Sequence, residues 1–133
     1  MVGHVIVLDT HALLWWALDP QHLSERALQL LEGMEREGGF ASAISIWELG
    51  IKVKRKKLEL PIAVEELARR IERSNVVELL PVDTNIWLRS VALDWMHSDP
   101  ADRVIVATAL SRNLPLLTKD QVIRDFAGVA SIW

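Results

Sequence analysis

Four acidic residues in this chain are spaced so that a parallel sheet would bring their side chains together. Each follows a β-prone apolar run or lies in the first turns of a helix facing the same sheet edge. The four are Asp9, Glu48, Asp102 and Asp120. Carboxylates crowded at one edge repel each other, and hard divalent cations such as Mg²⁺ or Mn²⁺ are the usual reason for such a cluster. Two such ions about 4 Å apart can activate a water molecule and stabilise the leaving oxygen of a phosphodiester.

Three of these acids also have a purely local interpretation. Asp9 could cap the helix that follows it, and Asp120 could be an ordinary turn residue. The run from Ser45 to Glu48 fits a capping box, in which Glu48 closes a helix start. One shared explanation for all the acids is simpler than a separate one for each, so the metal-site hypothesis is preferred.

Asp99 and Asp102 have to be distinguished, because both lie at a predicted helix start. Asp99 precedes Pro100, which is tolerated at a first helical position, so Asp99 is best interpreted as the N-cap. Asp102 has the apolar residues Val106 and Ala109 at i+4 and i+7, which places it on the buried face. Asp102 is therefore the member of this pair that we expect in the site.

The elements that position these residues alternate between strands and helices. An unbroken apolar run such as Val5–Leu8 is typical of a strand that is buried on both faces. The alternation predicts a single α/β domain over residues 1–133, a three-layer α/β/α sandwich with a short parallel central sheet. Ligands of such folds bind beyond the carboxyl ends of the strands. The predicted strands are Val5–Leu8, Phe40–Ile44, Val76–Val82, Leu114–Thr118 and an edge strand at Val129–Trp133.

Helical patterns fill the segments between these strands. Ser24 is a typical N-cap, and Gly38-Gly39 is a typical helix end. The predicted helices are Thr10–Leu18, Glu25–Glu37, Ile46–Lys57, an amphipathic segment through Val64–Ile71, a segment after Asp83 or Thr84, Pro100–Arg112 and Val122–Phe126. In the helix after Asp83, the residues expected to face inward are Leu88, Val91, Ala92 and Trp95.

Four segments together resemble a known family. They are Val7–His11, Ser42–Leu49, His97–Arg103 and Leu117–Asp120. Over essentially the whole chain, the sequence is similar to a PIN domain, and more narrowly to the VapC-type ribonuclease toxins of toxin–antitoxin pairs. The patterns Ser-x-x-Ser-x-x-Glu-Leu and Asp-Pro-x-Asp-Arg carry most of this resemblance when they occur together.

The resemblance implies a metal-dependent endoribonuclease that uses Mg²⁺ or Mn²⁺. The implied metal ligands and catalytic residues are Asp9, Glu48, Asp102 and Asp120, of which the last occupies the family's most variable acidic position. Thr10 and Thr118 match hydroxyl positions beside the metals, where they would orient water or a carboxylate. The resemblance further implies an RNA substrate, a homodimer, and a small cognate antitoxin whose peptide reaches the acidic groove.

A basic run lies close in sequence to Glu48. Residues 52–57 hold five positive charges in six positions. They could form a phosphate-steering patch, with Lys52, Lys54 and Arg55 as candidate RNA contacts. They could equally be a solvated helix end whose cations complement the helix dipole. Both interpretations remain open on the sequence.

Arg103 and two histidines lie beside the predicted ligands. Arg103 could contact a phosphate or pair with Asp99. His11 and His97 are excluded as metal ligands, because a carboxylate site for hard ions needs neither of them.

Composition narrows the class of protein further. The chain has 133 residues, half of them apolar and a quarter charged, which suffices for one domain with its own core. It has no cysteine, which excludes disulfides and thiolate metal sites and fits a cytoplasmic protein. No apolar run reaches the ~18 residues of a membrane span. With a formal net charge of −3, nucleic-acid binding would need a local basic patch or metal ions.

Other functions fit parts of the pattern. A strand that ends in Asp-Thr resembles phosphoaspartyl phosphatases of the haloacid dehalogenase type, but these need a second acid where this chain has His11. The run Leu117–Lys119 resembles receiver domains, but the acid that would end the third strand, Asp83, fits their pattern poorly. A binding module that has lost catalysis is the remaining alternative, and the presence of all four acids argues against it.

Overall fold

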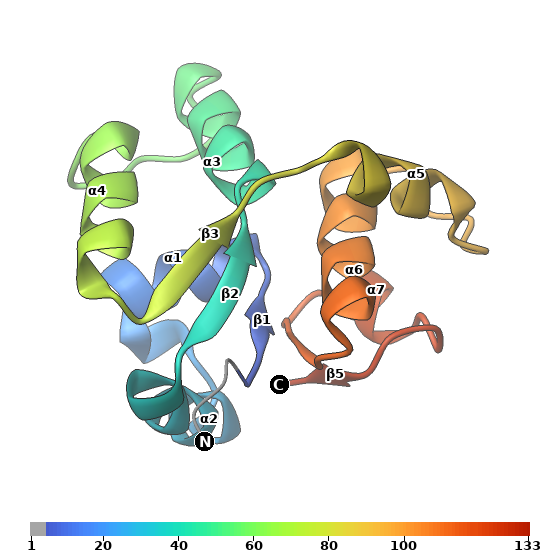
Figure 1. The fold of residues 1–133 in the computed structure, drawn as a ribbon. Helices are drawn as coiled ribbons and strands as arrows, with labels where there is room; N and C mark the ends of the chain where they lie inside the picture. Colours follow the sequence, from blue (N-terminus) through green and yellow to red (C-terminus); the bar gives the residue numbers. More distant parts are fainter. Residues whose placement is uncertain (1–4) are drawn as a thin grey trace.

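Among residues 5–133, which the computed structural model describes, five short parallel strands form one central sheet (Figure 1). The strands are β1 (Val7–Leu8), β2 (Gly39–Ser42), β3 (Val77–Leu80), β4 (Leu116–Leu117) and β5 (Ser131–Ile132). They lie in the order β3-β2-β1-β4-β5, and every neighbouring pair is parallel. β1 is the central strand and is fully buried, as its unbroken apolar sequence predicts.

Helices cover both faces of this sheet and complete the predicted three-layer sandwich. They are α1 (Thr10–Leu18), a 3₁₀ helix η1 (Pro20–His22), α2 (Glu25–Glu37), α3 (Ile44–Lys54), α4 (Val64–Ser74), α5 (Thr84–Ala92), α6 (Pro100–Arg112) and α7 (Gln121–Arg124). In Figure 1, α1, α2 and α4 lie on one side of the sheet, and α6 and α7 lie on the other. Within residues 5–133, no helix is long and apolar enough to cross a membrane.

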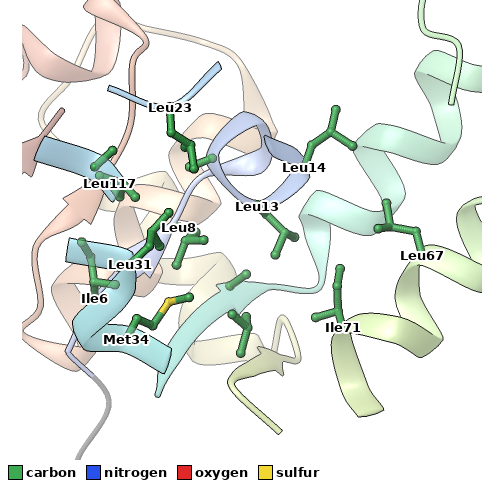
Figure 2. Close-up of a cluster of buried hydrophobic side chains, with 14 of the residues drawn as sticks. Ile6, Leu8, Leu13, Leu14, Leu23, Leu31, Met34, Leu67, Ile71 and Leu117 are labelled. Atoms are coloured by element: carbon green, nitrogen blue, oxygen red, sulfur yellow. The ribbon is translucent and has the colours of Figure 1, made fainter. Parts of the chain in front are cut away.

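Successive side chains of the central strand point to opposite faces of the sheet, so the core has two parts. Ile6 and Leu8 belong to the cluster shown in Figure 2, together with Leu13 of α1, Met34 of α2 and Ile71 of α4. Val7 points to the other face, where it packs in a cluster with side chains of α6. Each of these side chains contributes roughly 1.5–3 kcal/mol by leaving water. Burial of both faces therefore fixes the position of the residue that follows β1.

The strand order creates a topological switch point beside β1. From β1 the chain moves to β2 and β3 on one side, and then crosses to β4 and β5 on the other side. Such a reversal leaves an opening at the carboxyl ends of the strands, where ligands of open α/β sheets bind. In the register of the sheet, Leu8 pairs with Ala41 and with Leu117. The residues after β1 and β4 therefore meet at this opening.

Several predicted boundaries are corrected by the structure. The strands are shorter than the apolar runs, because the flanking residues already serve turns and helix caps. β1, for example, ends at Leu8 since Asp9 caps α1. The helix predicted to begin at Ile46 begins at Ile44, because the Ser42 hydroxyl accepts a hydrogen bond from the Ile44 N–H at 3.2 Å and starts the helix early.

The predicted inward face of α5 is wrong. Leu88 is 65% exposed and Val91 is 78% exposed, whereas Ile86 and Ser90 are buried. Trp95 lies beyond the end of the helix, because α5 stops at Ala92, but it packs against the core as expected. An apolar stripe at helical spacing therefore exists on α5, but the core of this chain does not cover it.

Candidate active site

Asp9 is the first residue after β1 and the N-cap of α1. Its Oδ1 accepts a hydrogen bond from the Ala12 N–H at 2.8 Å, and its Oδ2 accepts one from the Thr118 hydroxyl. The residue is only 3% exposed. The pKa of Asp9 is raised to about 6, mainly by burial and less by the charges of Asp120 and Glu48, against the lowering effect of the two hydrogen bonds. Asp9 therefore both caps α1 and belongs to the cluster of acidic residues.

Glu48 lies in the second turn of α3 and is held by its neighbours. The capping-box interpretation is wrong, because α3 begins at Ile44, and its N-cap residue is Ala43, which makes no side-chain capping hydrogen bond. Glu48 Oε1 instead accepts a hydrogen bond from the Thr10 hydroxyl at 2.6 Å. The Thr10 hydroxyl is also hydrogen-bonded to that of Ser45 at 2.9 Å. Glu48 Oε2 lies 3.4 Å from the Lys52 Nζ.

Asp102 lies in the first turn of α6. Its N–H donates to Asp99 Oδ1 at 2.9 Å, so Asp99 is the N-cap, as predicted. Its Oδ2 lies 2.7 Å from His97 Nε2, and its side chain is 17% exposed. Burial raises the pKa of Asp102 to about 6. The hydrogen bond to His97 opposes this shift, and the charge of Asp99 adds to it.

Arg103 was expected to contact a phosphate or to pair with Asp99, but in the structure its guanidinium group bonds backbone carbonyls instead. This group donates hydrogen bonds of 2.7–3.3 Å to backbone carbonyl oxygens in the last turn of α5 and in the chain between α5 and α6. The acceptors are Ser90, Val91, Leu93, Trp95 and His97. Residues 93–99 form neither helix nor strand, so this one cation organises an irregular segment. Because that segment carries His97, Arg103 also holds the hydrogen-bond partner of Asp102.

Asp120 follows β4 and caps the short helix α7. Its Oδ1 accepts a hydrogen bond from the Val122 N–H at 2.9 Å, and its own N–H donates to the Thr118 hydroxyl oxygen at 3.1 Å. The Thr118 hydroxyl, which is fully buried, donates to Asp9 and accepts from the Asp120 N–H, so it links the two acidic residues. Asp120 is thus locally a turn and cap residue, as one interpretation of the sequence predicted, and its charge also raises the pKa of Asp9.

The four predicted acids converge on one hollow of about 180 Å³ at the carboxyl edge of the sheet, which we call the acidic hollow. Its lining residues are Asp9, Thr10, His11, Glu48, Lys52, Asp99, Asp102 and Asp120. Within residues 5–133, no group of three or more histidine, aspartate or glutamate side chains stands ready to hold a metal ion. Mg²⁺ usually keeps several waters and takes only one or two carboxylates directly. The oxygen donors and the volume of the hollow therefore fit a hydrated hard cation rather than a fully enclosed one.

The chain matches the family model of the PIN domain over residues 6–129. It belongs to the PIN domain family. A curated relative of this PIN domain, Ribonuclease VapC22 of Mycobacterium tuberculosis (strain ATCC 25618 / H37Rv), is 32% identical over 121 residues, which cover 90% of each chain.

Solved structures show the same PIN fold. The crystal structure of FitAcB from Neisseria gonorrhoeae has a TM-score of 0.69, with 26% identity over 97% of both chains. A toxin–antitoxin complex from Klebsiella pneumoniae has a TM-score of 0.63, with 24% identity over 96% of both chains. These likenesses confirm the predicted fold, and the family model and the curated relative confirm the predicted family.

Two features of this PIN domain are absent from the sequence-based prediction. His97 is a partner of Asp102, although histidine was considered only as a metal ligand. Ser45 supports Thr10, although it was considered only as a helix cap. The five-residue separation of His97 and Asp102 spans an irregular segment, so no periodic pattern signals their contact. Ser45 and Thr10 are 35 positions apart and meet only through the fold.

Proposed function

We propose that this PIN domain is a metal-dependent endoribonuclease and the toxin of a toxin–antitoxin pair. The observation that carries the proposal is the convergence of Asp9, Glu48, Asp102 and Asp120 on the acidic hollow. The relative named Ribonuclease VapC22 supports a ribonuclease, and the toxin–antitoxin complex among the structural relatives supports the biological setting.

Mg²⁺ or Mn²⁺ is the cofactor that fits the acidic hollow, and the four carboxylates that would hold it are those of Asp9, Glu48, Asp102 and Asp120. When bound, such an ion stabilises developing negative charge and lowers the pKa of water to a value useful at neutral pH. The protein's own residues prepare the carboxylates. The pKa values of Asp9 and Asp102 are raised to about 6, which still leaves both carboxylates mostly ionised at neutral pH. Thr118 fixes the orientation of Asp9, and Thr10 fixes that of Glu48.

A cleavage assay tests this function. Single-stranded RNA incubated with the protein and Mg²⁺ or Mn²⁺ should be cut, and a chelator should stop the reaction. In-line attack by water leaves 5′-phosphate and 3′-hydroxyl ends, whereas attack by the RNA's own 2′-hydroxyl leaves a cyclic phosphate. Undiminished cleavage in EDTA, or cyclic-phosphate products, would overturn the metal mechanism. A phosphatase, a receiver or an inactive binding module would leave the RNA uncut.

An antitoxin is the partner that we propose for the acidic hollow. A basic side chain, most simply arginine, can pair with two carboxylates at once and occupy the place of the cation. RNA and antitoxin would then compete for this protein in the cytoplasm. Inhibition of cleavage by the product of the adjacent gene should weaken as Mn²⁺ is added; inhibition that is indifferent to Mn²⁺ would contradict this site of action.

A homodimer is the assembly that we propose, with the exposed stripe of α5 at its interface. Trp87, Leu88 and Val91 are 46%, 65% and 78% exposed, and contiguous apolar surface of this kind marks interaction sites. Light scattering should show a dimer for the wild type and a monomer for Leu88→Asp. A strict monomer of the wild type at high concentration would contradict the proposal.

A further inference from the structure

The acidic hollow contains a cation of the protein's own. Lys52 lies one turn after Glu48 on α3, and its side chain is only 33% exposed. Within residues 5–133, it is the one lysine or arginine among the residues that line the hollow. The other cations of the basic run are exposed and do not line it; they are Lys54, Arg55, Lys56 and Lys57. The sequence therefore places five cations together, and the fold turns one of them into the site.

The spacing of Glu48 and Lys52 has a structural explanation of its own. A glutamate followed by a cation at i+4 is a common stabilising pair on helices. In α4, Arg70 Nε lies 3.5 Å from Glu66 Oε1 with the same spacing, and Arg70 is exposed, as such surface pairs usually are. Lys52 differs because its side chain lies in a hollow that is lined by five aspartate and glutamate residues. Helix stabilisation explains the pair in α4 but does not require a cation in the acidic hollow.

The Glu48 carboxylate has a donor or a cation beside each of its oxygens. Its Oε1 accepts a hydrogen bond from the Thr10 hydroxyl at 2.6 Å, and its Oε2 lies 3.4 Å from Lys52 Nζ. A carboxylate has about four lone-pair sites, so Glu48 keeps sites for a divalent cation. Mechanisms with two metal ions place a second positive charge about 4 Å from the first. Next to Glu48 Oε2, such a charge is already present as the ammonium group of Lys52.

Lys52 also has donors left for a substrate. An ammonium group has three N–H donors, and within residues 5–133 its ion-pair partner is Glu48 alone. Lysine binds phosphate as a compact point charge. The remaining N–H groups can therefore donate to phosphate oxygens that enter the acidic hollow.

We propose that Lys52 is a catalytic residue that contacts the scissile phosphate and supplies the second positive charge of the site, so that one divalent cation suffices for cleavage. The proposal rests on the nuclease function above and specifies how that site stabilises its transition state. A water oxygen forms a bond to phosphorus, the bond from phosphorus to the 3′ oxygen breaks, and the departing oxygen takes a proton from solvent water. Lys52 keeps its protons throughout and stabilises the negative charge on the phosphate oxygens.

The number of bound ions tests the proposal without any substrate. Mn²⁺ is titrated into the RNA-free protein at neutral pH, and free Mn²⁺ is measured by electron paramagnetic resonance. The wild type should bind one ion per chain. Lys52→Met keeps a straight, helix-forming side chain but leaves the position beside Glu48 Oε2 without its cation, so this variant should bind a second ion. Two ions in the wild type, or equal numbers in the two proteins, would overturn the proposal.

Rates of RNA cleavage with Mn²⁺ test the catalytic role. Lys52→Met should lower kcat by about 100-fold with little change in KM, because a group that stabilises transition-state charge is worth about 10²- to 10³-fold. Lys52→Arg keeps the charge and should recover most of the lost kcat. A raised KM with unchanged kcat would show that Lys52 only binds RNA. No recovery in Lys52→Arg relative to Lys52→Met would overturn the role of the charge.

Arg70→Met is the matched control for both measurements. It removes the cation of an equally spaced helical pair that lines no part of the acidic hollow, so kcat and the single bound Mn²⁺ should not change. If the wild type and Lys52→Met cut RNA equally fast, the role of Lys52 falls and the nuclease function remains. If the wild type does not cut RNA with Mn²⁺, the nuclease function falls and the role of Lys52 falls with it.

Discussion

Asp9 and Asp102 reach the same pKa of about 6 because both are withdrawn from water, but the protein holds them in different ways. The partners of Asp9 are the Ala12 N–H in the first turn of α1 and the Thr118 hydroxyl just after β4. The partner of Asp102 is His97, which lies in the irregular segment before α6. One carboxylate is thus positioned by the sheet and its caps, and the other by a loop.

Because Asp9 is held by the sheet and Asp102 by a loop, the two halves of the site depend on different parts of the chain for their stability. The sheet side rests on β1, whose residues are completely buried between two parallel neighbours. The loop side rests on Arg103, which satisfies backbone carbonyls that have no helix or strand to bond them. Since an unsatisfied buried carbonyl costs about 1–3 kcal/mol, loss of the Arg103 guanidinium should loosen residues 93–99.

The largest effect that we expect is loss of RNA cleavage in Asp9→Asn and Asp102→Asn. Each change keeps the shape of the side chain and removes one negative charge from the acidic hollow. Supporting residues of metal sites are worth about 10–100-fold in activity, so loss of a direct ligand should lower kcat/KM by more than about 100-fold.

Asp83→Asn is the matched control, because Asp83 caps α5 through the Ile86 N–H at 2.9 Å and lines no part of the acidic hollow. Asparagine caps a helix nearly as well as aspartate, so this variant should keep its activity. If all three variants remain equally active, then Asp9 only caps α1, Asp102 is only a residue of the first turn of α6, and neither has a catalytic role.

The sheet side of the site was largely predictable from sequence. The continuous apolar run of β1 predicted a central buried strand, and a residue directly after such a strand lies at the ligand-binding edge. Asp9 and the hydroxyl of Thr118 were placed there correctly, since both follow strands that pair in register at Leu8 and Leu117. The capping pattern of Asp99 was also predicted, because a cap acts over three residues and needs no knowledge of the fold.

The loop side could not be predicted in the same way. Arg103 bonds backbone carbonyls, which every residue carries, so its partners leave no signature in the sequence. The face of α5 was misassigned for a related reason. Leu88 and Val91 have the spacing of a buried stripe, but periodicity does not distinguish a surface covered by the chain's own core from one left exposed.

The pH dependence of stability should reveal the burial of both carboxylates. A carboxyl group whose pKa is about 6 when folded and 3.8 when unfolded binds its proton more tightly in the folded state. The unfolding free energy of the metal-free protein should therefore fall as the pH rises from 4 to 6, by about 2 kcal/mol for each such group. Urea unfolding across this range measures the fall.

Measurements on the Asn variants, with and without Mn²⁺, show how much of this pH dependence of stability comes from Asp9 and how much from Asp102. Asp9→Asn and Asp102→Asn should each flatten the fall and should melt at or above the wild-type temperature without metal. Mn²⁺ at ~100 times its dissociation constant should stabilise the wild type by about 2.7 kcal/mol at neutral pH, and each variant by less. Stability that rises between pH 4 and 6 would show that neither carboxylate is held in a desolvated site.

The smallest effect that we expect is a loss of Mn²⁺ affinity in Arg103→Lys, and it tests the loop side alone. A lysine keeps the charge but cannot donate along the fork-shaped pattern that reaches several carbonyls at once. Amide hydrogen exchange should therefore accelerate in residues 93–99 and stay unchanged after β1. Because His97 would no longer be fixed beside Asp102, the Mn²⁺ dissociation constant, measured by electron paramagnetic resonance, should rise by about 10-fold. Arg69→Lys, on the exposed surface of α4, serves as the control, since within residues 5–133 the Arg69 side chain bonds only Glu66, at 3.1 Å, and should tolerate the exchange. Faster exchange that spreads to the end of β1, or an unchanged Mn²⁺ affinity despite a loosened segment, would show that Asp102 is not positioned by its loop and that the two sides of the site are held alike.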